Sequence, residues 1–129
     1  MLLEFMNVLA LYFAPGSKYA NAVGVFTAWE RSKRDPAVHA FVQYLVNWVA
    51  GVKLIFLALL GLIVLFGDAD LQRLSLLVLA LTTATFYWRL FPLVRKMARR
   101  GEVEPGNYAT VLGVMILAFI AAFAGAAIF

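Results

Sequence analysis

Cysteine is absent from this sequence, and charged residues are scarce in it. Without cysteine, disulfides, thiolate metal sites and thiol nucleophiles are all excluded. Charged residues make up only 14% of the 129 residues, whereas hydrophobic residues make up 64%. A soluble domain is usually about 45 to 50% apolar, and a small one buries only about two-thirds of its unfolded surface. The surplus apolar surface must face lipid or other helices, so we expect an integral membrane protein.

Histidine and intramembrane acids are scarce as well. His39 is the only histidine, which excludes multi-histidine haem or metal ligation within one chain. Glu4 is the only acid inside a run that we expect to enter the membrane, and the other acids lie in or beside predicted loops. Acid–base and metal-assisted catalysis need such groups. We therefore predict no catalytic residues, no metal and no cofactor, and the balance is against an enzyme.

Three long apolar segments predict an all-α membrane fold. The first covers about 36–66 and begins at Asp35-Pro36, an N-cap residue followed by proline in the first helical position. The second covers about 71–93 and ends near Pro92, and the third covers about 107–129. At 1.5 Å per residue the first helix is roughly 46 Å long, more than the roughly 30 Å of bilayer hydrocarbon. Its first turns must therefore project beyond the hydrocarbon.

Residues 1–34 allow two interpretations, because Pro15-Gly16 interrupts them. One is a pair of helices that are interfacial or re-entrant, over 2–14 and 17–34. The other is a kinked fourth span over 2–29. We favour the pair, since Pro and Gly break helices and Lys18 at mid-membrane would cost about 2.5 to 3.5 kcal/mol. No basic residue precedes the first apolar run, so we expect it to stay uncleaved.

The basic residues predict how the chain is oriented. They cluster at 31–34 and 95–100, whereas the hairpin between the first two spans offers only Arg73. Short loops rich in Lys and Arg stay in the cytoplasm, so we place both clusters there and the carboxyl terminus outside. We treat 1–129 as one polytopic domain, with the helical pair followed by a three-span bundle over 35–129. Such clustering is typical of membrane topology and not of nucleic-acid binding.

Polar residues inside a bilayer are costly, so each marks a partner or a function. His39, Gln43 and Asn47 recur every four residues on the first span and form one stripe. This stripe is either a hydrophilic or headgroup-binding face, or a helix surface that lies outside the hydrocarbon. His39 near the inner membrane surface would also be the base of a lipid-directed enzyme.

Lys53 is the most informative of these polar residues. If the hydrocarbon begins near Tyr44, Lys53 lies roughly 13 Å inside it. An intramembrane lysine binds an anion, carries a proton or pairs with an acid, or else it snorkels towards the membrane surface. Within this chain the best acidic partner is Glu4.

The second and third spans contain polar and small residues, respectively. Ser75, Thr82, Thr85 and Arg89 share one face of the second span, where they either line a path or bond to their own and neighbouring helices. The third span has no ionisable side chain, and its small residues include Gly113, Ala121 and Gly125. Small residues let helices approach closely, so we expect these three to pack against another helix, within the protein or between copies.

These patterns favour a small non-catalytic membrane protein that acts through assembly, as a homo-oligomer or an accessory subunit. The alternative is an oligomeric channel or transporter for a small or anionic solute, with His39, Gln43, Asn47, Lys53, Ser75, Thr82, Thr85 and Arg89 along the path. An enzyme that acts on lipid is a further alternative. The expected partners are membrane lipids, anionic ones included, and the protein itself or another membrane protein, but no nucleic acid.

Overall fold

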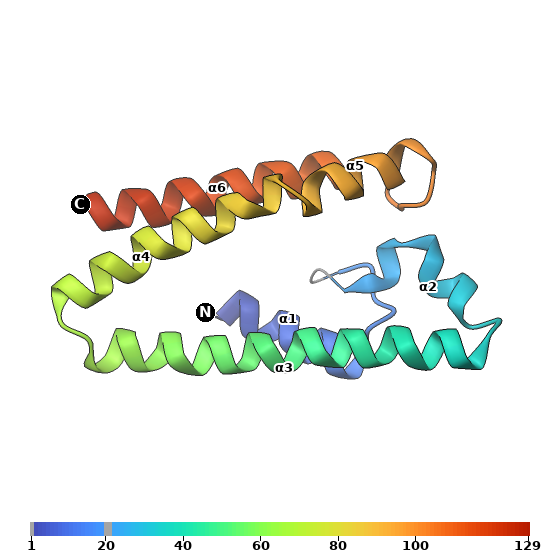
Figure 1. Ribbon diagram of the computed structural model, residues 1–129, viewed down its shortest axis with the longest axis horizontal. Helices are drawn as coiled ribbons and strands as arrows, with labels where there is room; N and C mark the ends of the chain where they lie inside the picture. Colours follow the sequence, from blue (N-terminus) through green and yellow to red (C-terminus); the bar gives the residue numbers. More distant parts are fainter. Residues whose placement is uncertain (1, 20–21) are drawn as a thin grey trace. The chain divides into compact units, whose positions relative to one another are not determined.

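The computed structural model describes residues 2–19 and 22–129, and this part of the chain is helical. The elements in chain order are α1 (Leu2–Phe13), η1 (Val23–Val25), α2 (Thr27–Ser32), α3 (Pro36–Phe66), α4 (Ala69–Ala84), η2 (Thr85–Tyr87), α5 (Leu90–Arg99) and α6 (Tyr108–Ile128) (Figure 1). Within the described residues, three helical segments are long and apolar enough to cross a membrane: Pro36–Phe66, Ala69–Arg99 and Tyr108–Ile128. The predicted all-α membrane fold with three spans is confirmed.

The described chain divides into two compact units. The first contains the residues up to Leu60 together with Glu102–Pro105, and the second contains Gly61–Gly101 and Gly106–Phe129. The expectation of a single domain over 1–129, with a three-span bundle over 35–129, stays a prediction.

Helix α3 begins where the sequence predicts. The Asp35 carboxylate accepts hydrogen bonds from the backbone N–H groups of Ala37 (3.0 Å) and Val38 (3.3 Å), which have no partner within the helix. Pro36 follows in the first helical position, where its missing N–H costs nothing. The helix then runs for 31 residues without a break.

Helix α1 is a separate short helix that packs along α3 in the first unit. Its 12 residues span about 18 Å, too little to cross roughly 30 Å of hydrocarbon. A small core joins the two helices, in which Leu11 of α1 packs with Val46 and Ala50 of α3 and with Ala22. The N-terminal segment therefore forms a pair of helices and not one kinked helix over 2–29.

The second N-terminal helix is shorter than expected, because it begins at Thr27 and not at Ser17. Before it, backbone groups bond within a compact loop, from the Val23 N–H to the Pro15 carbonyl (3.0 Å) and from the Gly24 N–H to the Ser17 carbonyl (3.1 Å). A Cβ at Gly24 would lie 2.0 Å from the Gly16 carbonyl oxygen. The missing side chain of Gly24 thus allows a close backbone approach in place of a helix.

The segment Glu102–Pro105 belongs to the same unit and docks on this loop. Phe26 and Val103 form an isolated antiparallel bridge, and the Glu104 N–H donates to the Val25 carbonyl (2.7 Å). Val103 is only 3% exposed. Lys18 pairs with Glu104 at 2.8 Å on the surface of this junction.

In the second unit, a tight hairpin joins the end of α3 to α4. The Asp68 side chain accepts from the Leu71 N–H (2.8 Å) and caps α4. The Gln72 amide reaches back to the carbonyls of Val64 (3.2 Å) and Gly67 (3.1 Å), which are left open at the end of α3. Side-chain hydrogen bonds therefore satisfy both helix ends of the hairpin.

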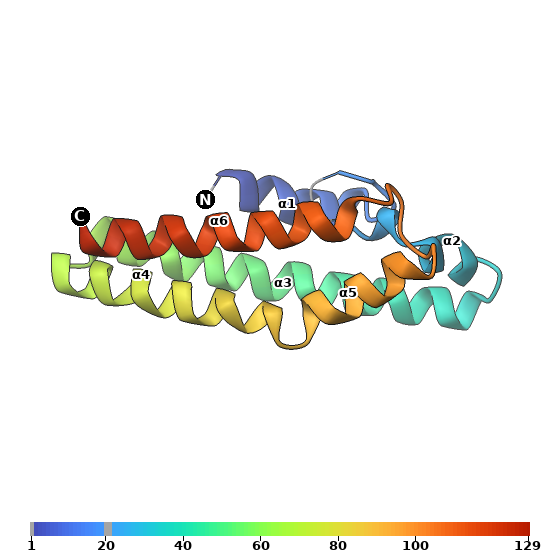
Figure 2. The ribbon, with the colours of Figure 1, turned by 90° about the horizontal axis from the view of Figure 1, so that it is seen from above.

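The second span does not end near Pro92, which corrects the prediction. The helix breaks earlier, over Thr85–Arg89, and resumes as α5 from Leu90 to Arg99, so much of the predicted basic loop at 95–100 is helical (Figure 2). Proline clashes with the carbonyl four residues before it, here that of Trp88, but it is tolerated in a first turn. Pro92 therefore interrupts the helical hydrogen bonding at the Trp88 carbonyl, and it lies in the first turn of α5.

Helix α6 packs against α4 and α5 within the second unit. Its 21 residues match the predicted third span and extend about 31 Å, close to the thickness of the hydrocarbon. Asn107 precedes it as the N-cap residue.

Candidate functional site

The most distinctive polar site lies between α1 and α3. The Lys53 ammonium donates to the Glu4 carboxylate at 2.9 Å and to the Asn7 side-chain oxygen at 2.6 Å. The expected pair of Lys53 with Glu4 therefore forms. Helix α1 supplies both of these partners. Sequence analysis missed Asn7, although it lies three residues after Glu4 on the same helical face.

Local helix geometry explains how α1 presents these groups. Residues 4, 7 and 11 recur at helical spacing, so Glu4, Asn7 and Leu11 share one face. Because Leu11 packs on Val46 and Ala50 while Glu4 meets Lys53, the two helices run antiparallel (Figure 1). Ala50 is fully buried, and its small side chain allows the close approach. Apolar packing at one end of α1 thus holds the ion pair at the other.

Burial makes this cluster energetically important. Asn7 is only 3% exposed, and among the described residues its side-chain nitrogen has no hydrogen-bond partner. The side chains of Lys53 and Glu4 keep 32% and 35% exposure, so one edge of the pair remains open. An open charged pair inside hydrocarbon needs a polar cover or water. The open edge of the Lys53–Glu4 pair can therefore accept one further polar group.

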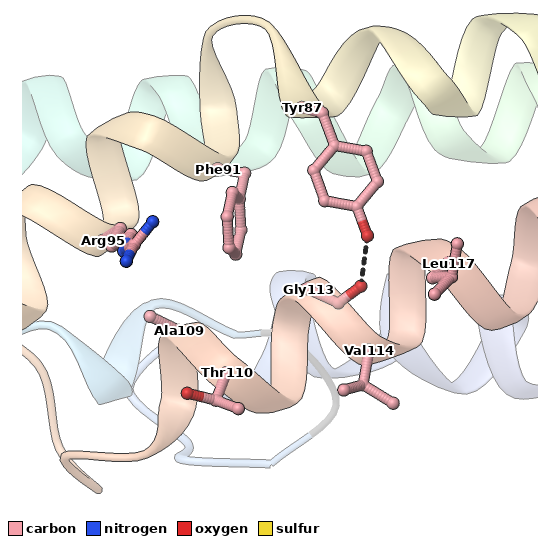
Figure 3. Close-up of a pocket in the computed structure, with 8 residues that line it drawn as sticks. All are labelled: Tyr87, Phe91, Arg95, Ala109, Thr110, Gly113, Val114 and Leu117. Carbon is pink, nitrogen blue, oxygen red and sulfur yellow. Dashed lines mark hydrogen bonds between the residues drawn. The ribbon is translucent and has the colours of Figure 1, made fainter.

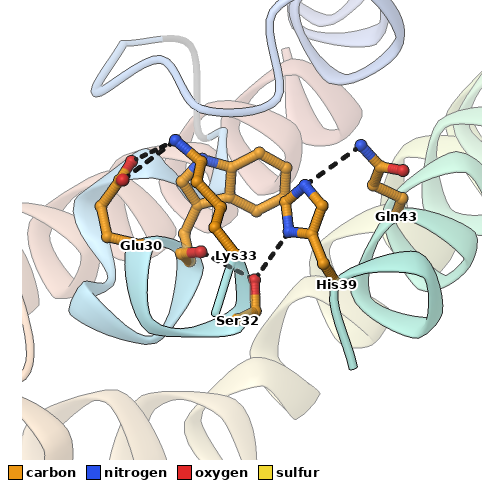
Figure 4. A network of polar contacts seen from close by, with 6 residues as sticks. Glu30, Ser32, Lys33, His39 and Gln43 are labelled. Carbon is orange, nitrogen blue, oxygen red and sulfur yellow. Dashed lines mark hydrogen bonds and ion pairs between the residues drawn. The ribbon is translucent and has the colours of Figure 1, made fainter. Parts of the chain in front are cut away.

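The predicted stripe on α3 begins in a second polar network, around His39 (Figure 4). Ser32 donates its hydroxyl proton to the Trp29 carbonyl (2.7 Å), and its oxygen lies 2.8 Å from Nδ1 of His39. Nε2 of His39 lies 3.3 Å from the Gln43 amide nitrogen. All three contacts are hydrogen bonds when Nδ1 of His39 bears the proton and donates to the Ser32 oxygen, and Nε2 accepts from the Gln43 amide.

That arrangement has consequences for chemistry at His39. A general base must accept the proton of its nucleophile, whereas here the Ser32 proton points to the Trp29 carbonyl. The His39 ring also packs on Trp29, with centroids 4.8 Å apart, and so joins α2 to the start of α3. The network fits a structural joint better than a catalytic pair. Asn47 lies further along the stripe and is exposed.

The predicted polar face on the second span consists mainly of hydroxyls that bond to their own helix. Ser75 donates to the Leu71 carbonyl (2.7 Å), Thr82 to that of Val78 (2.8 Å), and Thr85 to that of Thr82 (2.6 Å). Arg89 lies in the break before α5, 5.9 Å from the Trp88 ring. The hydroxyls therefore already have partners within their own helical segment.

The three small residues singled out on α6 have different surroundings. Gly113 is buried: its carbonyl accepts from the Tyr87 hydroxyl, and a Cβ there would lie 2.7 Å from the Phe91 ring (Figure 3). Ala121 is exposed, and a Cβ at Gly125 would meet nothing within 4 Å. Gly113 thus serves packing within the protein, whereas Ala121 and Gly125 remain open.

These observations define the protein as an all-α, multi-pass membrane protein in which the short helix α1 packs against α3. Among the described residues, no group of three or more histidine, cysteine, aspartate or glutamate side chains could hold a metal ion. No protein-family model, no curated protein and no solved structure matches this chain. Its function must therefore be argued from its own geometry.

Proposed function

We propose that this protein acts through assembly in the membrane, as a homo-oligomer or as an accessory subunit, and without catalysis. One observation supports this most directly: the open face of α6, which contains Ala118, Ala121, Ala122 and Gly125. The first three are exposed, and Gly125 leaves open space where a side chain would be.

Helices associate in lipid mainly through close van der Waals packing, because lipid tails are as apolar as leucine. Small residues spaced four apart, such as Ala121 and Gly125, permit that approach. The contrast with Gly113 supports the proposal, since the same residue type is covered by Phe91 where α6 packs within its own unit. We propose a second copy as the occupant of this face.

The test is the oligomeric mass of the protein in mild detergent. Gly125→Leu should convert the oligomer to a protomer, because the leucine would hold the two helices apart. Gly106→Leu is the matched control: its Cβ position is equally open, but it lies in the loop before α6. An unchanged mass in Gly125→Leu would refute this interface, and a monomeric wild type would leave only the accessory-subunit form of the proposal.

A second candidate function is a pathway for a small anionic solute, and the Lys53 cluster favours it. A partly open ion pair inside an apolar segment is the kind of group that lines a polar path. His39, Gln43 and Asn47 lie nearer the start of the same helix, and Arg89 lies on the second span. This candidate also requires assembly, since three spans enclose little space.

Chloride flux into liposomes that contain the purified protein tests this candidate. Lys53→Met should abolish the flux, because it removes the only cation in the cluster while preserving side-chain length. Lys18→Met is the control, since Lys18 pairs with Glu104 in the loops. No flux above that of empty liposomes in the wild type would eliminate the pathway and leave assembly alone.

A further inference from the structure

The second unit contains a pocket of about 380 Å³ between η2, α5 and α6 (Figure 3). It forms where the chain breaks ahead of Pro92, which displaces α5 from the line of α4. Its walls include Tyr87, Phe91, Thr110, Val114 and Leu117, and Arg95 lies at one end. The pocket is therefore largely apolar with a single cationic group.

The depth of the pocket follows from α6. This helix extends about 31 Å, so its two ends lie near the two membrane surfaces. From Ala109 to Leu117 the helix rises about 12 Å, compared with about 15 Å for half of the hydrocarbon. Figure 3 places Arg95 near Ala109 and Leu117 at the opposite end. The pocket thus runs from the membrane surface through most of one leaflet.

The positive charge of Arg95 at the membrane surface has no ion-pair partner among the described residues. Helix α5 contains Arg95, Lys96 and Arg99 and no acidic residue. Arg95 is exposed, and within the described part of the chain it forms no ion pair. A guanidinium matches the oxygens of a phosphate with two parallel hydrogen bonds, and neighbouring cations add attraction for an anion.

The volume of the pocket distinguishes between two apolar occupants, a helix and an acyl chain. A helix segment 12 Å long and 10 Å wide fills roughly 900 Å³. This exceeds the empty space in the pocket, about 710 Å³ with its open side included. A single acyl chain is much narrower. We propose that this pocket binds an anionic phospholipid of the bilayer, with one acyl chain along Phe91, Val114 and Leu117 and its phosphate on Arg95. This site is separate from the open face of α6 that we propose for assembly.

Native mass spectrometry tests the proposal with protein from vesicles of equal parts phosphatidylglycerol and phosphatidylcholine. The wild type should retain phosphatidylglycerol in preference to phosphatidylcholine. Arg95→Gln should lower that retention about tenfold, because it removes a charge-assisted hydrogen bond. Arg100→Gln loses the same charge just after α5 and outside the pocket, so it should change retention by no more than about twofold. Equal losses in both variants would indicate diffuse surface attraction and overturn the site.

Two further measurements test the acyl-chain part of the proposal. Val114→Phe should lower retention of both lipids, and since Val114 is 63% exposed the larger ring should not disturb folding. In the wild type, phosphatidylglycerol with a spin label in mid-chain should broaden the amide signals of Gly113 and Leu117 more than that of Ala121. Uniform broadening along α6, or unchanged retention in Val114→Phe, would show that no chain occupies the pocket.

Discussion

Lys53 illustrates how a single residue gains its role from a distant segment. Its position in an apolar run allows snorkelling, anion binding or pairing, and the sequence favours none of them. Glu4 and Asn7 lie 49 and 46 residues away, and they reach Lys53 only because α1 folds back along α3. The pair then keeps the charge inside the apolar region and ties the N-terminal helix in place.

We predict that Lys53→Met destabilises the protein by about 1 to 3 kcal/mol, because it leaves Glu4 and Asn7 without their donor. The double variant Lys53→Met/Glu4→Leu should recover much of this loss, since no unpaired charge remains. Unfolding free energies in mixed micelles, followed by circular dichroism, measure both. If the two single losses simply add in the double variant, the residues are not coupled and the prediction is wrong.

The exposed pair of Lys18 and Glu104 leads to a prediction about pH. The hydrogen bond and the charge of Lys18 hold the pKa of Glu104 below its usual value of 4.5. A lowered pKa in the folded state means that the pair contributes stability above about pH 4.5 and loses it as pH falls through the folded pKa.

Nuclear magnetic resonance titration of the Glu104 carboxyl carbon measures this shift directly. We expect a midpoint below 4.5 in the wild type and a return towards that value in Lys18→Met. Added salt should also raise the wild-type midpoint, because exposed charges are screened. An identical midpoint in the two proteins would contradict the pairing.

At the scale of elements, the structure departs from the sequence-based prediction where Pro92 lies. We expected the helix to stop near the proline, but α4 stops at Ala84, and the α-helix resumes as α5 at Leu90. A proline lacks the N–H that would bond to the carbonyl four residues before it and clashes with that carbonyl, but it is compatible with the first turn of a helix. The basic residues that follow can therefore lie on a helix, and the break shapes the pocket beside α6.

We predict that Pro92→Ala extends helical structure through residues 85–89. The alanine removes the clash with the Trp88 carbonyl and restores an N–H donor. Backbone chemical shifts and amide exchange rates of these residues report the change. If the break persists with unaltered exchange, the packing of Tyr87 and Phe91 on α6 holds it open, and Pro92 is not its cause.

The second N-terminal helix departs from prediction for a different reason. The segment 17–26 includes apolar side chains that are compatible with a helix, yet backbone groups of its described residues bond within a loop and to Glu102–Pro105. Local propensity cannot anticipate a partner segment more than seventy residues away, such as the Glu102 carbonyl that accepts from the Thr27 N–H. Tertiary contacts override propensity at such positions.

At the scale of the whole molecule, the open prediction is orientation. The basic segments at 31–34 and 95–100 favour a cytoplasmic location, with the hairpin at 67–70 and the carboxyl terminus outside. Because the chain has no cysteine, any single introduced cysteine is a unique label. Ala69→Cys and Gly106→Cys are both at exposed positions, on opposite sides in this topology.

In intact cells, a membrane-impermeant maleimide should label Ala69→Cys and leave Gly106→Cys unlabelled. Permeabilised cells should give labelling of both variants, which shows that each thiol is reactive. The reverse pattern in intact cells would invert the topology, and equal labelling of both would indicate mixed orientations.

The sequence by itself determined that this protein is helical and spans a membrane three times, and where α3 begins. Those properties depend on hydrophobic runs, caps and turn residues that act over a few neighbouring positions. Only the tertiary structure decided that Lys53 pairs with Glu4 and Asn7, that Gly113 is covered by Phe91 while Gly125 is open, and that the second N-terminal helix begins only at Thr27. These outcomes depend on contacts between segments far apart in the chain. A periodic pattern shows which residues share one face of a helix, but it does not show which segment packs against that face.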